Sequence, residues 1–109
     1  MDDREFAAEA DRTLQRLQDA VERALDAADP EIELRGGILT IELADGGQFV
    51  VNKHAPTRQI WVSSPVSGAA HYAWDEAAGR WRSTRGPDLL EAKLAADLAQ
   101  ATGLPVAIG

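Results

Sequence analysis

The chain has 109 residues, a formal net charge of −7 at pH 7 and no cysteine. A chain of this length can bury one hydrophobic core and hardly more, so we predict a single domain over residues 1–109. The missing thiols exclude disulfides and cysteine-held metal clusters, and the negative charge repels nucleic acid phosphates, so we expect no nucleic acid partner.

The N-terminal third carries the whole net charge and shows no targeting signal. Residues 1–33 hold eleven acids and four arginines, which gives 4 − 11 = −7, whereas residues 34–109 hold seven acids and seven bases. The first residues lack both the apolar stretch of a secretion signal and the Arg- and Ser-rich composition of an import leader. No apolar run approaches the ~20 residues of a membrane helix. We therefore expect a cytoplasmic protein without a membrane partner.

The first element is predicted to be an amphipathic helix that begins near Asp2 or Asp3 and ends before Pro30. Either aspartate can cap the helix, and acidic side chains in the first turn suit the helix dipole. One apolar stripe recurs at steps of three and four residues: Phe6, Ala10, Leu14, Leu17, Val21 and Leu25. This stripe is expected to face the core.

Acidic side chains are predicted to form a ridge along this helix and the strand that follows it. At 100° per residue, four acids fall on one flank of the helix: Asp11, Asp19, Glu22 and Asp26. Asp29, Glu31 and Glu33 extend this row of exposed acids into the strand, where Ile32 and Leu34 point inward. A charged helix face is usually a solvated surface, but unpaired like charges across two elements favour a cation or a basic partner. A cluster of carboxylates without His or Cys can bind Fe²⁺, Fe³⁺, Mn²⁺, Ca²⁺ or Mg²⁺, and the cluster itself does not distinguish between these ions.

The middle of the chain is predicted to be an antiparallel meander. Short turn segments separate its strands, at Gly36-Gly37, at Asp45-Gly46-Gly47 and around Pro56. Short connections between successive strands favour antiparallel pairing. Two further strands are expected at residues 71–74 and around Trp81.

A second helix is predicted to start near Asp88, with Glu91 completing a capping box. Gly103 is expected to stop it, after an apolar stripe that includes Leu90, Leu94 and Leu98. One helix, about six strands and one helix predict an α+β fold, a two-layer sandwich with the N- and C-terminal helices packed on one face of an antiparallel sheet. The tail, residues 104–109, is expected to lie between the helices, and the other sheet face is left free.

A polar patch around one tryptophan is predicted on that free face. Ile60 and Val62 point inward by alternation, so their neighbours face outward. The outward-facing residues of three adjacent strands form what we call the tryptophan patch: Asn52, Gln59, Trp61 and His71. A Trp on a polar strand face is typical of an interaction hot spot, and cover by the chain's own tail or a helix is the alternative. We predict that Trp61 is substantially exposed and binds a partner, and we assign His54 to a loop.

Residues 52–68 carry a motif that resembles the signature of the frataxin family. The matching positions are Asn52-Lys53-x-x-Pro56-x-x-Gln59-Ile60-Trp61-x-Ser63-Ser64-Pro65-x-Ser67-Gly68. Residues 36–40 and Tyr72-x-Trp74 also fit, so the resemblance covers nearly the whole chain and is closest to the bacterial, CyaY-type branch. It implies the frataxin-like fold and a bacterial protein.

The resemblance further implies that iron, as Fe²⁺ or Fe³⁺, is the metal of the ridge, bound weakly and exchangeably, with other divalent cations able to substitute. Carried over residue by residue, it implies an iron-binding surface to which Asp26 adds one more acid. We call the whole set the acidic ridge: Asp3, Asp11, Asp19, Glu22, Asp26, Asp29, Glu31 and Glu33. The chain departs from the richest family ridges at Gln18, Arg23 and Ala27, which argues against a high iron stoichiometry.

Two functions remain open. The first, implied by the resemblance, is an iron-binding modulator of iron–sulfur cluster assembly, an iron donor or regulator. It would act as a monomer on the cysteine desulfurase through the ridge and on the scaffold protein through the tryptophan patch. The alternative is a ferroxidase or iron-storage protein, although the chain lacks the Glu-x-x-His sequence of converged di-iron sites. We identify no catalytic residue, because Ser63-Ser64-Pro65 starts a turn rather than a nucleophile elbow.

Overall fold

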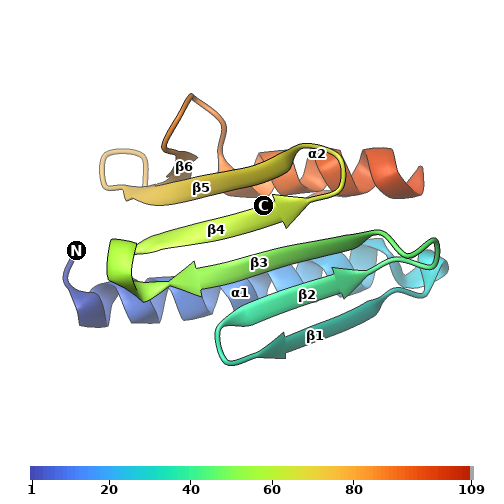
Figure 1. Ribbon diagram of the computed structural model, residues 1–109, viewed down its shortest axis with the longest axis horizontal. Coiled ribbons are helices and arrows are strands. Elements are labelled where there is room, and N and C mark those ends of the chain that lie inside the picture. Colours follow the sequence, from blue (N-terminus) through green and yellow to red (C-terminus); the bar gives the residue numbers. More distant parts are fainter. Residues whose placement is uncertain (109) are drawn as a thin grey trace.

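The computed structural model describes residues 1–108, which run in the order helix, six strands, helix (Figure 1). The helices and strands are α1 (Asp3–Ala24), β1 (Glu31–Arg35), β2 (Ile38–Glu42), β3 (Gln48–His54), β4 (Gln59–Ser64), β5 (Gly68–Asp75), β6 (Arg80–Ser83) and α2 (Leu90–Thr102). Two short 3₁₀ turns follow α1 and β3: η1 (Asp26–Ala28) and η2 (Ala55–Thr57).

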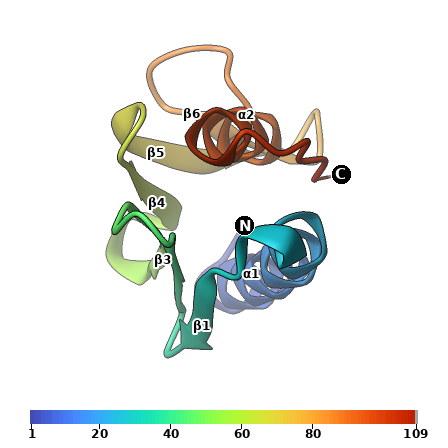
Figure 2. The same cartoon turned by 90° about the vertical axis from the view of Figure 1, so that its right-hand side faces the viewer.

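The strands of the described chain form one antiparallel sheet in the order β1-β2-β3-β4-β5-β6. Both helices lie on the same side of this sheet, α1 beside β1 and α2 beside β6 (Figure 2). The predicted fold class, two helices on one face of an antiparallel sheet, is confirmed. Short turns dictate this order, because each turn returns the chain beside the strand that it has just left.

The core lies between the helices and the sheet. Every residue of the apolar stripe predicted for the first helix is buried, as are Phe49 and Val51 of β3 and Ile60 and Val62 of β4. Trp81 of β6 is fully buried, and its indole Nε1 donates a hydrogen bond to Thr13 Oγ1 of α1 at 2.8 Å. This bond allows an indole N–H to enter the core without the cost of an unpaired donor.

The start of α2 differs from the prediction. The helix begins at Leu90 with Leu89 as its N-cap and without a side-chain cap, so the expected capping box of Asp88 and Glu91 does not form. Glu91 is 3% exposed and accepts a hydrogen bond from Arg16 of α1 at 2.9 Å. A buried carboxylate is costly without a charged partner, so Glu91 pairs across the two helices instead of capping its own.

The C-terminal tail packs on the core. Leu104 and Val106 are partly buried against it, and Ile108 is buried. The tail leaves α2 on the helix side of the sheet (Figure 2), and Gly109 lies outside the described residues. Within residues 1–108, no helix combines the length and the apolar character that crossing a bilayer requires.

A buried carboxylate fastens the β4–β5 turn to α2. Asp97 is 5% exposed, and its two oxygens accept hydrogen bonds from Ser64 Oγ and Ser67 Oγ, both at 2.9 Å. Ser64 Oγ also accepts from the backbone N–H groups of Val66 and Ser67. Lys93 Nζ lies 3.9 Å from the same carboxylate. Two serines of the signature motif therefore link the hairpin that carries Trp61 to the second helix.

We expect Asp97→Asn to lower the free energy of unfolding by about 1.5 kcal/mol, because the amide keeps one accepting oxygen for two serine hydroxyls. Urea denaturation followed by circular dichroism measures the loss. Asp88→Asn, at an exposed position in the loop before α2, is the matched control and should change stability by less than about 0.5 kcal/mol. Equal losses for the two variants would contradict the fastening role of Asp97.

The only tyrosine of the chain is buried beside this carboxylate. Tyr72 is 2% exposed, and burial, with smaller contributions from Asp88 and Asp97, raises its pKa to about 12. An unfolded tyrosine ionises near pH 10. As the pH rises, the unfolded chain therefore loses its proton before the folded chain does.

We expect stability to be unaffected by this group below about pH 10 and to fall as the pH rises from 10 to 12. Because the chain has one tyrosine, the tyrosinate absorbance of the native protein reports Tyr72 directly. Tyr72→Phe should remove this part of the alkaline loss of stability. An ionisation near pH 10 in the native protein would contradict the burial argument.

Candidate functional site

The free face of the sheet presents its side chains in cross-strand rows. In one row Ile38 of β2 pairs with Asn52 of β3, Asn52 with Trp61 of β4, and Trp61 with His71 of β5. The register thus brings three residues of the tryptophan patch side by side. Gln59 lies two residues from Trp61 on the same face. Arg35 of β1 lies on the other side of Ile38 in this row. Ile38 is 44% exposed and is the only exposed large hydrophobic residue among residues 1–108.

Trp61 lies between two histidine rings, and we call His54, Trp61 and His71 the aromatic stack. The indole and His54 ring centroids are 3.7 Å apart, those of the indole and His71 are 4.2 Å apart, and the planes differ by 11° and 10°. The indole Nε1 donates to Gln59 Oε1 at 2.8 Å. His54 Nδ1 forms a hydrogen bond of 2.7 Å with Thr57 Oγ1. These contacts hold the indole in one orientation. A partner that bound the indole would therefore have little side-chain entropy of Trp61 to remove.

Two expectations about this patch are wrong. Trp61 is half-buried rather than substantially exposed, because an imidazole covers each face of the indole. His54 is the last residue of β3 rather than part of a loop. Extending the alternation of β3 from Asn52 by two residues places His54 on the outer face, so the sequence pattern did contain the signal for this residue.

Toward β6 the same sheet face carries an ion pair. Arg82 Nε donates to Asp75 Oδ2 at 2.8 Å. This hydrogen bond, followed by one from the backbone N–H of Ala78, lowers the pKa of Asp75. Between the aromatic stack and β6, the charges of Asp75 and Arg82 therefore neutralise each other.

Two carboxylates of the acidic ridge are paired with bases of the β3–β4 hairpin. Asp3 accepts a hydrogen bond from Arg58 Nε at 2.7 Å, and Asp11 accepts one from Lys53 Nζ at 2.8 Å. These pairs join the first half of α1 to the β3–β4 hairpin. The expectation of unpaired ridge charges is therefore wrong at Asp11, and it is also wrong at Glu33, which pairs with Arg35.

The second half of the ridge lies beyond these ion pairs. A depression of about 480 Å³ is lined by Asp19, Glu22, Arg23 and Asp26. Asp26 belongs to η1, so the ridge continues past the end of α1 at Ala24. Asp29 follows with a backbone φ of 49°, a left-handed conformation that aspartate tolerates, and the chain turns there toward β1.

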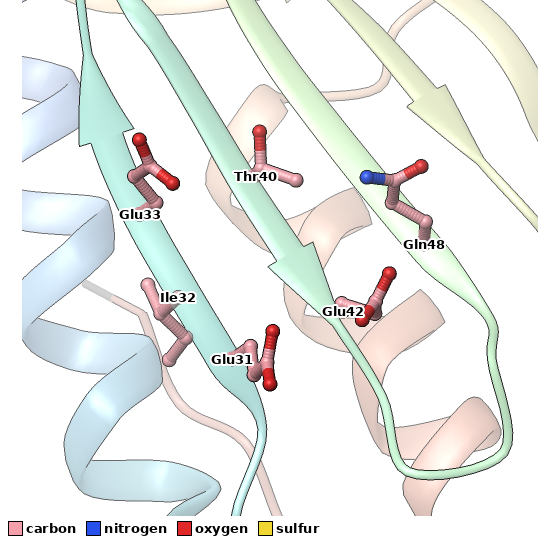
Figure 3. Close-up of a pocket in the computed structure, with 6 residues that line it drawn as sticks. All are labelled: Glu31, Ile32, Glu33, Thr40, Glu42 and Gln48. Carbon is pink, nitrogen blue, oxygen red and sulfur yellow. The ribbon is translucent and has the colours of Figure 1, made fainter.

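Another depression of about 480 Å³ lies over the first strands of the sheet (Figure 3), lined by Glu31, Ile32, Glu33, Thr40, Glu42 and Gln48. Glu31 of β1 stands directly opposite Glu42 of β2, and like charges in this arrangement destabilise a sheet. Glu33 pairs with the exposed Arg35 at 3.1 Å. Glu42 was not among the predicted ridge residues, although the inward-facing Leu39 and Ile41 on the same strand indicate that it points to solvent.

The ridge offers separate carboxylates rather than a closed metal site. Within residues 1–108, no three His, Asp or Glu side chains converge in a way that could hold a metal ion. The ridge acids are hard oxygen donors of the kind that divalent cations and Fe³⁺ accept. All eight are exposed, so they can also contact the basic side chains of another protein.

The fold and these surfaces define a class of small two-layer α+β protein, with an acidic flank on the first helix and edge strand and a free sheet face that carries an aromatic stack. A family model described as a frataxin-like domain matches residues 1–104. The chain therefore belongs to the frataxin family.

Curated relatives and solved structures agree with this assignment. An iron–sulfur cluster assembly protein CyaY of Dechloromonas aromatica is 42% identical over 94% of this chain and 94% of its own length. A mitochondrial frataxin homolog of Schizosaccharomyces pombe is 36% identical over 95% of this chain and 68% of its own length.

Two solved structures show the same fold. The frataxin of Psychromonas ingrahamii superposes with a TM-score of 0.87 at 25% identity, over 100% of this chain and 99% of that one. A trimeric frataxin from the yeast Saccharomyces cerevisiae, complexed with ferrous iron, gives a TM-score of 0.77 at 34% identity, over 87% and 86% of the two chains.

Proposed function

We propose that this protein is an iron-binding modulator of iron–sulfur cluster assembly, an iron donor or regulator that acts in the cytoplasm as a monomer. The acidic ridge is assigned to iron and to a basic surface of the cysteine desulfurase. The tryptophan patch is assigned to the scaffold protein. The observation that carries the proposal is the position of the ridge beside a free sheet face with an aromatic stack, in a chain whose relatives are named for iron–sulfur cluster assembly.

In this proposal iron is cargo rather than a resident cofactor. Separate, exposed carboxylates such as Glu22, Asp26 and Glu31 supply one or two ligands each, and water completes the coordination. Such sites bind weakly and exchange quickly, and other divalent cations compete for them. The ferrous complex of the yeast relative supports the choice of iron.

The same carboxylates suit a basic protein surface. The ridge carries more acid than base. Arg58 and Lys53 pair with acids of its first half, and the exposed Arg35 pairs with Glu33 at its end. Between Asp19 and Glu31 the chain carries five acids and a single base, Arg23, so the excess of negative charge lies there. Complementary charges of this kind speed association and orient the partner, with a strong dependence on ionic strength.

The test is a pull-down of purified cysteine desulfurase and of its complex with the scaffold protein, with and without Fe²⁺. We expect retention by the tagged protein at about 0.1 M salt and its loss near 1 M salt, since the Debye length falls from about 10 Å to about 3 Å. Failure to retain either protein at low salt would refute the proposal. Rapid Fe²⁺-dependent oxygen uptake by the protein alone would instead favour the ferroxidase alternative.

A further inference from the structure

We infer that Ile38 and Glu42 extend the tryptophan patch into one docking surface along β2. The surface fits a protein segment that presents an apolar side chain and, about 13 Å away, a basic side chain. Ile38 and Glu42 are four residue steps apart on β2, which places them about 13 Å from each other. The inference rests on the proposed function, because it describes the partner segment that the free sheet face would receive.

The apolar contact is assigned to Ile38 because the aromatic stack leaves little of the Trp61 indole free for a partner. Both faces of the Trp61 indole are covered by imidazoles, and its N–H is already bonded to Gln59. The indole therefore offers its edge to a partner. Ile38, two strands away in the same row, offers an aliphatic side chain that residues 1–108 leave 44% exposed. Burial of such a group on binding is favourable.

The charged contact is assigned to the other end of β2. Glu42 stands between Glu31 on β1 and Gln48 on β3, so its cross-strand row contains two carboxylates and no base. Figure 3 shows these side chains around one depression of the sheet face. The two like charges cost stability in the free protein, and a partner's lysine or arginine placed between them relieves that repulsion.

The two ends of β2 together define the partner. A segment that lies along β2 meets an aliphatic side chain at Ile38 and two carboxylates at Glu31 and Glu42. A purely polar segment would leave Ile38 in water, and an acidic segment would be repelled by Glu31 and Glu42. Arg35, opposite Ile38 on β1, is already paired with Glu33. A basic segment without an apolar side chain would leave Ile38 in water. We therefore assign the surface to a basic–apolar segment of the desulfurase–scaffold complex.

The apolar contact is tested with Ile38→Val and Ile38→Thr, measured by titration against the purified desulfurase–scaffold complex. Valine and threonine have nearly the same shape and are both β-branched, so the variants differ mainly in one hydroxyl group. We expect Ile38→Thr to bind about tenfold more weakly than Ile38→Val, with the same thermal midpoint, because position 38 is exposed.

The charged contact is tested with Glu42→Gln, and Glu76→Gln is its control. Both variants remove one negative charge, but Glu76 is exposed in the turn between β5 and β6, far from β2 in the strand order. We expect Glu42→Gln to weaken binding about fivefold at low salt and Glu76→Gln to leave it unchanged.

Each outcome is decisive for the docking surface. If the wild-type protein and Ile38→Val bind while Ile38→Thr and Glu42→Gln bind less tightly, the inference holds. If Trp61→Ala loses binding but Ile38→Thr binds as tightly as Ile38→Val, the docking surface along β2 is wrong and the proposed function stands. If the wild-type protein binds neither the desulfurase nor the complex, the proposed function and the docking surface both fail.

Discussion

Reversal of four ridge charges, Glu22, Asp26, Glu31 and Glu33 to Lys, is expected to abolish desulfurase binding. All four side chains are exposed, and the change reverses the sign of the potential over α1 and β1. We expect affinity to fall by at least about 100-fold, or roughly 3 kcal/mol. The thermal midpoint should stay equal or rise, because the repulsion between Glu31 and Glu42 is relieved while the exposed Glu33–Arg35 pair contributes little.

A matched pair of double variants separates the ridge from the total charge. Glu22→Lys with Asp26→Lys changes two ridge acids, and Glu76→Lys with Asp88→Lys makes the same change beside the opposite sheet edge. Calorimetric titration against the desulfurase should show a loss for the first pair alone. Equal losses for both pairs would mean that net charge, not the ridge, governs binding.

Trp61→Ala is expected to weaken association with the desulfurase–scaffold complex by ~2–3 kcal/mol, as truncation of interface tryptophans often does. The change removes the centre of the aromatic stack, so His54 and His71 lose the ring that holds them in place. Because Trp61 is half-buried, the stability loss should be about 1–2 kcal/mol, smaller than the ~3–5 kcal/mol typical of a core tryptophan.

Trp74→Ala provides the control for this change. Trp74 lies on the same sheet but packs against the core, where its ring is 5.2 Å from that of Trp81. We expect it to lose more stability than Trp61→Ala and to bind with unchanged affinity under conditions where it is folded. Denaturant unfolding beside a binding titration gives both quantities. If Trp61→Ala lost much stability but bound as tightly as the wild-type protein, Trp61 would contribute to folding like a core residue. Its assignment as a partner contact would then be wrong.

Periodicity in the sequence was sufficient to predict the layers of this fold. The stripe from Phe6 to Leu25 predicted a helix with one buried face, and the alternation around Ile60 and Val62 predicted a strand with a free outer face. Both patterns are local, because side-chain direction follows from the 3.6- and 2-residue repeats. Short glycine-rich turns then made the strand order nearly unambiguous.

The arrangement of side chains on the outer sheet face depended on register between strands that are distant in sequence. Alternation places Trp61 and His71 on one face but does not place them opposite each other, and it gave no sign that two imidazoles would cover the indole. The same holds for Glu31 and Glu42, which become neighbours through the β1–β2 pairing.

Residues 1–33 alone revealed a charged, amphipathic helix and an acidic chain, since charge and periodicity are properties of neighbouring residues. The folded structure decides which of those charges form ion pairs and which do not. Lys53 and Arg58 reach Asp11 and Asp3 because the β3–β4 hairpin lies against α1, and Arg16 reaches Glu91 because the two helices share one sheet face. Ion pairs form between side chains that folding brings within a few ångströms, whatever their separation along the chain.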